Sequence, residues 1–291
     1  MKRPILCAGR LYCDLIFADA PRMPTPGTEV FAPGVALHAG GGAFITGATL
    51  AGMGHRVWQF SMLPAAPFDT VVLAGMAEHG VVATACQPAP SGTDPQITVA
   101  IGTADDRAFL TRADGPALPD LESIDFADFC HLHIGELRTL QDAPELLDLA
   151  RAAGITVSLD CSWQDAYDKS AADLIGAVDV FLPNEREAAA LVKIGIPEAC
   201  APLTVIKSGM NGARACARKG GTWTRSAGAR VEVLDATGAG DAFNAGFLSC
   251  WLDHAPLEQC LARGNDYGAA AVQVLGGPTK LKHPTSTVTV T

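Results

Sequence analysis

One stretch near the end of the sequence places three small residues and a carboxylate between two apolar runs. It reads VLDATGAGDAFNAGF and covers residues 233–247. The run around 231–235 is typical of a strand, and the apolar residues after the glycines recur at helical spacing, which predicts a helix over 242–252. The small residues therefore lie at a predicted helix N-terminus, where unpaired N–H groups and the helix dipole favour a phosphate group: Gly238, Ala239 and Gly240.

Asp241 comes next, in the first turn of the predicted helix. A carboxylate at this place can accept the proton of a hydroxyl that attacks phosphorus. A structural explanation also fits, because aspartate often caps helices and glycine often precedes them. Two common phosphate motifs are absent: Phe243 stands where the third glycine of GxGxxG belongs, and GxxxxGK[ST] does not occur. The residues alone leave phosphate chemistry and an ordinary helix start both open.

The composition limits the classes to which this chain can belong. Its 291 residues are enough for one large domain, and the formal net charge of −10 is unsuited to nucleic acid or an anionic membrane as the main partner. Nine cysteines are scattered without a CxxC pair, which is typical of reduced thiols in a cytoplasmic protein. We therefore expect a cytoplasmic protein with no nucleic acid and no membrane as partner.

The second half of the sequence alternates strand-like and helix-like segments. Helices are predicted from Pro144 to Gly154 and from Glu185 to Lys193, each with apolar residues at helical spacing and a glycine near its end. This alternation indicates an α/β fold, with a mainly parallel central sheet flanked by helices. Short apolar runs rich in β-branched residues supply its strands, at 155–160, 178–183 and 202–207.

The first third of the sequence is richer in strand-like runs and turn residues. We expect these runs to form a small, mostly antiparallel β-sheet lid, built from insertions at about 11–37 and 93–115. A glycine loop and a helix are predicted at 38–54, and the residues after Gly276 are expected to form a loose tail. The predicted lid strands lie at 11–20, 28–37, 96–102 and 107–112, with a hairpin tip at 102–107.

The stretch DATGAGDAFNAGF resembles the signature of the ribokinase-like carbohydrate kinases of the phosphofructokinase-B type, D-[TS]-x-GAGD-x-F, although Ala236 stands where Thr or Ser is frequent. The resemblance implies that Asp241 is the catalytic base and that the backbone amides of Gly238–Asp241 form an anion hole for the transferred phosphoryl group. It further implies that residues 1–291 form a single ribokinase-like kinase domain with a lid.

Other motifs of this family follow in the expected order. AGRLYCDL resembles the motif whose acid, here Asp14, binds sugar hydroxyls, and HAGGGAF resembles the glycine pair against the substrate, here Gly41 and Gly42. Thr46 departs from the family, which commonly has asparagine in contact with the sugar at this position. Because a hydroxyl offers fewer hydrogen bonds than an amide, this departure affects the acceptor more than the reaction.

Three further motifs concern the nucleotide. PNEREA resembles the family's N-x-x-E, which implies that Asn184 lies near the phosphates and that Glu187 acts on Mg²⁺ through water; an ordinary helix start has the same appearance. RGNDYGAAAV resembles the helix whose asparagine, here Asn265, lies near the adenine or ribose. IKSGMNG resembles the nucleotide loop and supplies the remaining candidates: Lys207, Ser208, Gly209 and Gly212.

The resemblance implies an ATP-dependent kinase that phosphorylates a hydroxyl of a small sugar or sugar-like acceptor with the help of Mg²⁺. It also implies a homodimer formed through the lid, and it allows a monovalent cation (K⁺) near Asp235. Three alternatives stay open. They are a nucleoside kinase of the same fold, a phosphosugar kinase, and a non-catalytic protein that senses a sugar or nucleotide.

Several polar residues have no assigned role at this point. His131 and His133 face the same way on a predicted strand, but no third metal ligand has a clear place, so a structural role at the strand is expected. The sequence does not assign roles to four others near the predicted cleft or lid: Arg107, Glu136, Arg138 and Trp163.

Overall fold

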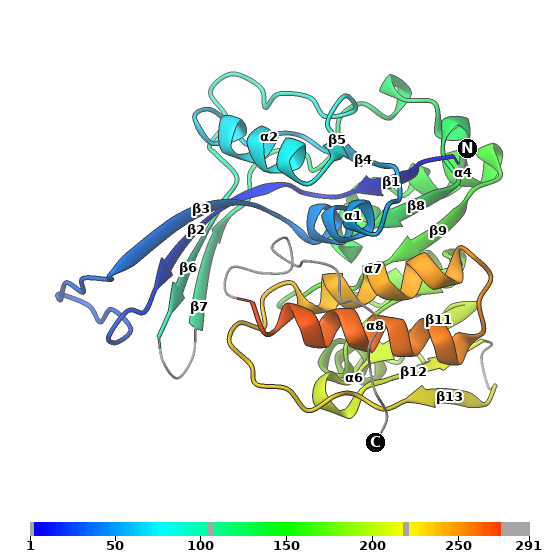
Figure 1. The fold of residues 1–291 in the computed structure, drawn as a ribbon. Coiled ribbons are helices and arrows are strands. Elements are labelled where there is room, and N and C mark those ends of the chain that lie inside the picture. Colours follow the sequence, from blue (N-terminus) through cyan, green and yellow to red (C-terminus); the bar gives the residue numbers. More distant parts are fainter. Residues whose placement is uncertain (1–2, 104–106, 218–220, 275–291) are drawn as a thin grey trace.

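The computed structural model describes residues 3–103, 107–217 and 221–274, and within these residues the chain forms two β-sheets (Figure 1). The larger sheet has nine strands in the order β13-β12-β11-β10-β9-β8-β1-β4-β5. These strands are β1 (Ile5–Ala8), β4 (Val57–Phe60), β5 (Val81–Val82), β8 (His131–Ile134), β9 (Thr156–Leu159), β10 (Val180–Phe181), β11 (Leu203–Lys207), β12 (Ala213–Cys216) and β13 (Trp223–Ser226).

This sheet is parallel from β5 to β11, and the antiparallel strands β12 and β13 complete one edge. The central strand β1 is apolar on both faces. On β1, Ile5 and Cys7 belong to one hydrophobic cluster, and Leu6 and Ala8 belong to another on the opposite face. Burial on both faces explains why β1 is a short continuous apolar run without alternation.

Helices cover both faces of the large sheet. The clusters on one face contain residues of α1 (Gly42–Gly52), α2 (Phe68–Glu78), α7 (Ala239–Trp251) and α8 (Leu257–Ala271). The cluster on the other face contains residues of α3 (Leu137–Asp142), α4 (Glu145–Ala153), α5 (Ala171–Ala177) and α6 (Glu185–Lys193). None of the described helices is long and apolar enough to cross a membrane.

The smaller sheet has four strands in the order β3-β2-β6-β7 and projects from one end of the core (Figure 1). Its strands are β2 (Tyr12–Ala18), β3 (Gly34–Gly40), β6 (Ile97–Gly102) and β7 (Arg107–Arg112). The β2–β3 and β6–β7 pairs are antiparallel, and β2 and β6 are parallel. We refer to these four strands as the lid sheet.

The α/β fold with a mainly parallel sheet, flanking helices and a smaller sheet is confirmed, as are the helices expected at 144–154 and 185–193. The strand predicted at 231–235 is wrong: Leu234 and Asp235 both donate their N–H groups to Val272 O, and no strand pairs with them among the described residues. The strand predicted at 28–37 begins only at Gly34, because Pro33 has no N–H group for a ladder. The predicted hairpin tip at 102–107 has Gly102 and Arg107 as register partners, and its residues 104–106 lie outside the described residues. The tail after Gly276 also lies outside the described residues.

Candidate active site

Asp241 lies in the first turn of α7, as the sequence predicts. The helix begins at Ala239, and its N-cap is Gly238, whose φ of 70° is in the left-handed region that favours glycine. The amide groups of the first turn have no intrahelical acceptors, so they point out of the helix beside the carboxylate. Gly238, Ala239 and Gly240 thus lie at a helix N-terminus with its positive dipole end.

A second helix N-terminus meets the first at this carboxylate. The helix α1 begins at Gly42, and a Cβ placed on Gly42 would lie 3.0 Å from Asp241 Oδ1. The preceding Gly41 has a φ of 109°, and any side chain on it would collide with the carbonyl oxygen of Arg10. The two glycines of this loop therefore allow the backbone of α1 to approach Asp241 closely.

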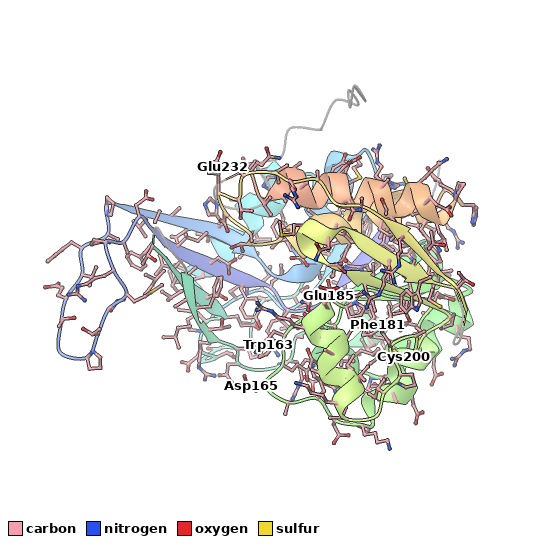
Figure 2. All side chains as sticks on the ribbon, turned by 90° about the horizontal axis from the view of Figure 1, so that it is seen from below. Trp163, Asp165, Phe181, Glu185, Cys200 and Glu232 are labelled. Carbon is pink, nitrogen blue, oxygen red and sulfur yellow. The ribbon has the colours of Figure 1, made fainter. Side chains whose placement is uncertain are left out.

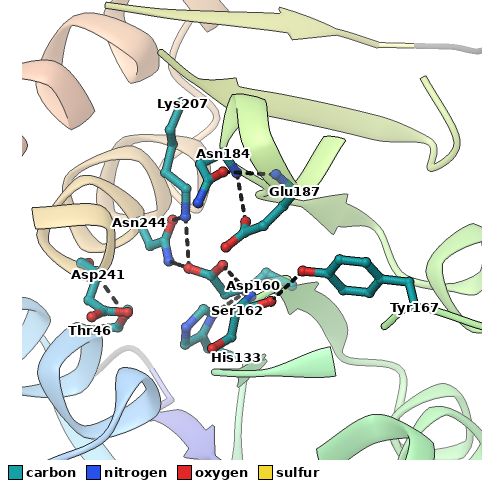
Figure 3. Close-up of polar contacts among 11 residues, drawn as sticks. Thr46, His133, Asp160, Ser162, Tyr167, Asn184, Glu187, Lys207, Asp241 and Asn244 are labelled. Atoms are coloured by element: carbon teal, nitrogen blue, oxygen red, sulfur yellow. Dashed lines mark hydrogen bonds and ion pairs between the residues drawn. The ribbon is translucent and has the colours of Figure 1, made fainter. Parts of the chain in front are cut away.

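A buried polar cluster lies on the other side of Asp241 (Figure 3). Lys207, the last residue of β11, donates from Nζ to Asp160 Oδ2 at 2.8 Å and to Asn244 Oδ1 at 3.1 Å. The Asn244 amide in turn donates to the same Asp160 oxygen, so the three side chains form a closed ring of hydrogen bonds. Because a Cβ on Gly240 would lie 3.6 Å from Lys207 Nζ, the ammonium group is adjacent to the first turn of α7.

Burial raises the pKa of Asp241 well above its usual range, and the charge of Asp160 adds to this effect. The Lys207 ammonium opposes it. Burial alone would lower the pKa of Lys207, but the carboxylates of Asp160 and Glu187 raise it above its ordinary value. The site therefore combines the charged ammonium group of Lys207 with the Asp241 carboxylate, whose proton affinity is increased. A carboxylate of increased proton affinity is suited to act as a general base.

Asn184 and Glu187 form a capping box at the start of α6. Asn184 Oδ1 accepts from the Glu187 N–H at 2.9 Å, and Glu187 Oε2 accepts from the Asn184 N–H at 2.8 Å. Glu187 is 5% exposed, and burial together with the charge of Asp160 raises its pKa to about 7. An acid that is only a helix cap is normally solvated, so this burial distinguishes Glu187 from an ordinary cap.

The donor set fits Mg²⁺ only in part. No group of three metal-ligating side chains gathers within the described residues. Glu187 is a buried carboxylate near a phosphate-favouring helix end, and Mg²⁺ usually takes one or two protein carboxylates while keeping water and substrate phosphates as its other ligands. The site thus fits an ion that arrives with the nucleotide.

The acceptor candidate Asp14 lies on β2, opposite His38 on β3 and Thr98 on β6. Burial raises the pKa of Asp14 to about 6, although a hydrogen bond with Thr98 partly opposes this effect. The carboxylate packs on Gly40, where any Cβ would collide with it. Asp14, His38 and Thr98 therefore share one face of the lid sheet, because paired residues point to the same side.

Thr46 lies in α1 and is fully buried. Its hydroxyl donates to the carbonyl oxygen of Asp241 at 3.3 Å, so it joins α1 to the first turn of α7. Contact between this hydroxyl and an acceptor stays a prediction. Glu136, which the sequence left without a role, accepts from Thr139 Oγ1 at 2.7 Å and from the backbone N–H of Arg10 at 3.3 Å.

The nucleotide candidates gather around the end of β11. Ser208 precedes a short 3₁₀ turn (Gly209–Asn211), and Gly212, with a φ of 87°, has no space for a side chain because the segment after β13 packs on it. The amide of Asn265 donates to Ser226 O and to Ala227 O, so it positions this same segment. A nucleotide contact by Asn265 stays a prediction.

His131 and His133 are buried on β8 and have structural partners. His131 hydrogen-bonds to Thr156 Oγ1 and Ser158 Oγ, and His133 hydrogen-bonds to Ser158 Oγ. Burial lowers their pKa values to about 3 and about 4, respectively, so both rings are neutral near pH 7. The expected structural role is consistent with these bonds.

Sequence analysis missed Asp160 and Asn244. Asp160 directly follows β9, at the carboxyl edge of a parallel sheet where such folds bind ligands, and Asn244 lies one helical turn after Asp241. A carboxylate directly after a strand, and an amide one helical turn after Asp241, are the sequence signals for these two residues. Trp163 lies on the loop after β9 (Figure 2). Its side chain is 69% exposed.

The amino-acid sequence matches the family model described as pfkB family carbohydrate kinase over residues 2–283. It is also 32% identical over 164 residues to the ATP-dependent ribose-1-phosphate kinase of Halopiger xanaduensis. That alignment covers 55% of this chain and 53% of the relative, so the chain spans about half the length of this protein.

Solved structures of this family share the fold. An uncharacterized sugar kinase from Pyrococcus horikoshii in complex with ATP has a TM-score of 0.78 at 19% identity, over 94% of each chain. The ribokinase of Arabidopsis thaliana in complex with ribose and ATP has a TM-score of 0.77 at 18% identity, over 96% of this chain and 95% of that one. Because the family model matches nearly the whole length, this chain belongs to the pfkB family of carbohydrate kinases.

Proposed function

We propose that this protein transfers the γ-phosphoryl group of ATP to a hydroxyl of a small sugar or sugar-like acceptor. One observation carries the proposal: the Asp241 carboxylate lies where the N-termini of α1 and α7 meet, beside a buried lysine. A base next to free amide groups is what phosphoryl transfer to a hydroxyl requires.

In the proposed mechanism, Asp241 accepts the proton of the acceptor hydroxyl as its oxygen attacks the γ-phosphorus. The first-turn amide groups of Gly238–Asp241 donate hydrogen bonds to the phosphoryl oxygens, whose negative charge spreads during transfer. Lys207, held by Asp160 and Asn244, supplies positive charge beside Gly240. Its fixed position means that little reorganisation is needed when the phosphoryl group arrives.

We place ATP along the core, with its phosphates toward the α7 N-terminus and its base near Asn265. The turn that contains Ser208, Gly209 and Gly212 borders this path. Glu187, with Asn184 at its side, would hold Mg²⁺ through water, and the ion would neutralise charge on the β- and γ-phosphates. Asp235, whose Oδ1 accepts from the Thr237 N–H at 2.8 Å, is the family-implied neighbour of a K⁺ ion.

We place the acceptor between the lid sheet and the glycine loop. Asp14 would accept hydrogen bonds from its hydroxyl groups, with Gly41 and Gly42 as the floor of the site. The Asp14 carboxylate on this side favours a neutral hydroxyl group over a second phosphate, because like charges repel. A nucleoside acceptor and a non-catalytic sensor are distinguished by the assay below.

We further propose that a second copy of this chain covers one face of the lid sheet. Leu15, Leu37, Val99 and Leu110 form a row of register partners on the face opposite Asp14. Leu37 is 44% exposed and Leu110 is 74% exposed. A contiguous exposed apolar face is typical of an interaction surface, and pairing two such faces would also protect the sheet edges.

The decisive assay measures ADP release from Mg·ATP across pentoses, hexoses, 2-keto-3-deoxy sugar acids, phosphosugars and nucleosides, with wild type and Asp241→Asn in parallel. We expect turnover with a sugar-type acceptor and a loss of about 10²–10⁴-fold in the variant. Affinity for a non-hydrolysable ATP analogue should stay within a few-fold. Asp173→Asn, which changes an exposed aspartate on α5, is the matched control and should leave turnover unchanged.

Three results would change the assignment. Turnover on nucleosides alone would make the protein a nucleoside kinase. Thermal stabilisation by an acceptor without any turnover would indicate a sensor. Turnover by Asp241→Asn close to that of wild type would remove Asp241 as the base and with it the proposed mechanism.

A further inference from the structure

A large cavity lies at the amino ends of the parallel strands, at the opposite end of the core from Asp241. It has a volume of about 900 Å³, and it is formed where β1 and β9 begin, just before β8, and where α7 ends. The proposed active site uses the carboxyl ends of these strands, so the two sites lie at opposite ends of the core. The side chains on which the argument rests are Arg3, His55, Arg56, Trp251, Asp253 and His254.

The charge in this cavity is the reverse of the charge of the whole chain. Two guanidinium groups and two imidazole rings line it, and Asp253 is the one carboxylate among its described lining residues, in a chain whose net charge is −10. In the described part of the chain, no carboxylate is bonded to Arg3 or Arg56. Arg3 donates from one Nη to Ala127 O at 3.0 Å, which fixes this arginine and leaves its other N–H groups for a ligand.

Helix capping does not explain these cations. Basic residues often lie near helix C-termini, where they offset the negative dipole end and the free carbonyl groups. At the end of α7, however, backbone N–H groups already bond these carbonyls: Cys250 O accepts from Asp253 and Ala255, and Trp251 O accepts from His254. His254 also has a φ of 58°, a conformation that costs a non-glycine residue about 1 kcal/mol or more and persists where the surroundings enforce it.

The cavity also offers a flat apolar surface. Trp251 is partly buried, and its ring packs edge-to-face on His131, with 5.8 Å between ring centroids. Arginines that line the same cavity as an aromatic ring suit a ligand with a phosphate group and a flat or apolar body, because guanidinium groups bind phosphate in a bidentate manner. A cavity of this volume is large enough for a molecule of nucleotide size.

The cavity is physically connected to the catalytic end of the core. Trp251 and Asp241 are the two ends of one helix, about 15 Å apart along its axis. Trp251 also contacts His131, which shares Ser158 with His133, and these residues lie on the strands that lead to Asp160. A shift of α7, or of the hydrogen-bonded residues His131, Ser158 and His133, would therefore move groups both at the cavity and near Asp241.

We propose that this cavity is a regulatory site for a small phosphorylated ligand with an aromatic or apolar body. Arg3 and Arg56 bind the phosphate, Trp251 contacts the body, and α7 transmits occupancy to the nucleotide site. This site is separate from the site of phosphoryl transfer, so its test requires no kinase turnover.

Phenyl phosphate is the probe, because it combines a dianion with one ring. Calorimetric titration of wild type should give saturable binding, and Arg56→Gln should weaken it by about 10–100-fold, as expected for loss of a charge-assisted contact. Arg22→Gln, which changes an arginine in the loop between β2 and β3, should leave the affinity unchanged. Inorganic phosphate should bind more weakly than phenyl phosphate.

Coupling is measured as the affinity for a non-hydrolysable ATP analogue with and without saturating phenyl phosphate. We expect a change of about 5-fold or more in wild type and none in Arg56→Gln.

Equal phenyl phosphate affinities in wild type and Arg56→Gln would overturn the site. Equal affinities for inorganic and phenyl phosphate would remove the role of Trp251. An affinity for the ATP analogue that is the same with and without phenyl phosphate would remove the regulatory role. Binding of the ATP analogue to Arg56→Gln in the absence of phenyl phosphate confirms that this variant is folded.

Discussion

Lys207 Nζ lies 2.8 Å from Asp160 Oδ2, and both side chains are almost completely buried. They come from the carboxyl ends of β11 and β9, which are separated in the sheet by β10. Asn244 of α7 bonds to both partners, so the ion pair joins two strands to the helix that carries Asp241. A buried pair of this kind costs desolvation energy and is a weak source of stability by itself. We attribute its presence to the positioning of charge beside the phosphoryl group.

The first prediction separates this positioning role from stability. Lys207→Met leaves Asp160 buried without its cation, which should lower the free energy of unfolding by about 3–5 kcal/mol. The double variant Lys207→Met/Asp160→Asn should recover most of that loss, because Asp160, the carboxylate in direct contact with the lysine, is then neutral. Urea unfolding of both proteins measures this difference.

Turnover should respond differently from stability. If Lys207 supplies positive charge to the phosphoryl group, the double variant should be stable, but its kcat should be about 10²-fold or more below that of wild type. A double variant with wild-type kcat would show that the lysine serves only to balance Asp160.

The second prediction concerns the space between α1 and Asp241. Gly42→Ala places a methyl group 3.0 Å from Asp241 Oδ1 and 3.0 Å from Gly135 O, which displaces the Asp241 carboxylate by a few tenths of an ångström. We expect kcat to fall by about 10–100-fold, because misplacement of reacting groups is costly. The melting temperature should also fall, because the backbone at Gly135 must shift. Steady-state kinetics and thermal unfolding measure the two effects.

Gly47→Ala is the matched control in the same helix. Its methyl group would lie 3.1 Å from Val57 Cγ1 and 3.2 Å from Cys7 Sγ, so the crowding is similar but involves only the core. This variant should lower the melting temperature and leave kcat near that of wild type. Equal kinetic losses in the two variants would mean that any crowding in α1 impairs the enzyme.

Much of the site follows from local sequence patterns. The start of α7, the place of Asp241 and the helix α6 are predictable because glycine, cap residues and helical spacing act within a few residues. The Asp160–Asn244 contact joins residues 84 positions apart, and only the order of the strands brings them together. The predicted strand at 231–235 fails for a related reason: an apolar run forms a strand only where a partner strand is available, and Val233 is 62% exposed instead.

The third prediction concerns the apolar face of the lid sheet. Leu110→Glu places a charge on the face formed by Leu15, Leu37 and Val99, so a dimer formed there should dissociate. Light scattering at micromolar concentration should give twice the chain mass for wild type and the single chain mass for the variant. Thr111→Glu changes the next residue, which bonds Thr98 on the opposite face, and should leave the dimer intact. A wild-type monomer would refute the proposed assembly.

The fourth prediction links acceptor binding to pH and stability through Asp14. Because burial raises the native pKa of this carboxyl to about 6, the folded protein holds the proton more tightly than the unfolded chain, whose carboxyl titrates near 4. The group therefore favours folding below about pH 4, and this contribution is lost as the pH rises through about 6. Asp14→Asn cannot ionise, so its free energy of unfolding should exceed that of wild type at pH 7.5 by up to about 3 kcal/mol. The gap should close toward pH 4.

The same variant should bind the acceptor less well. An ionised Asp14 accepts hydrogen bonds from hydroxyl groups on both oxygens, so the wild-type KM for the acceptor should fall as the pH rises through about 6. Asp14→Asn should raise this KM and remove its pH dependence, while the KM for ATP stays unchanged. Urea unfolding and acceptor kinetics at pH 4.5–8 measure both effects. A variant that is no more stable than wild type at pH 7.5 would mean that the buried carboxylate is already well solvated or paired. An acceptor KM without pH dependence in wild type would place Asp14 outside the acceptor site.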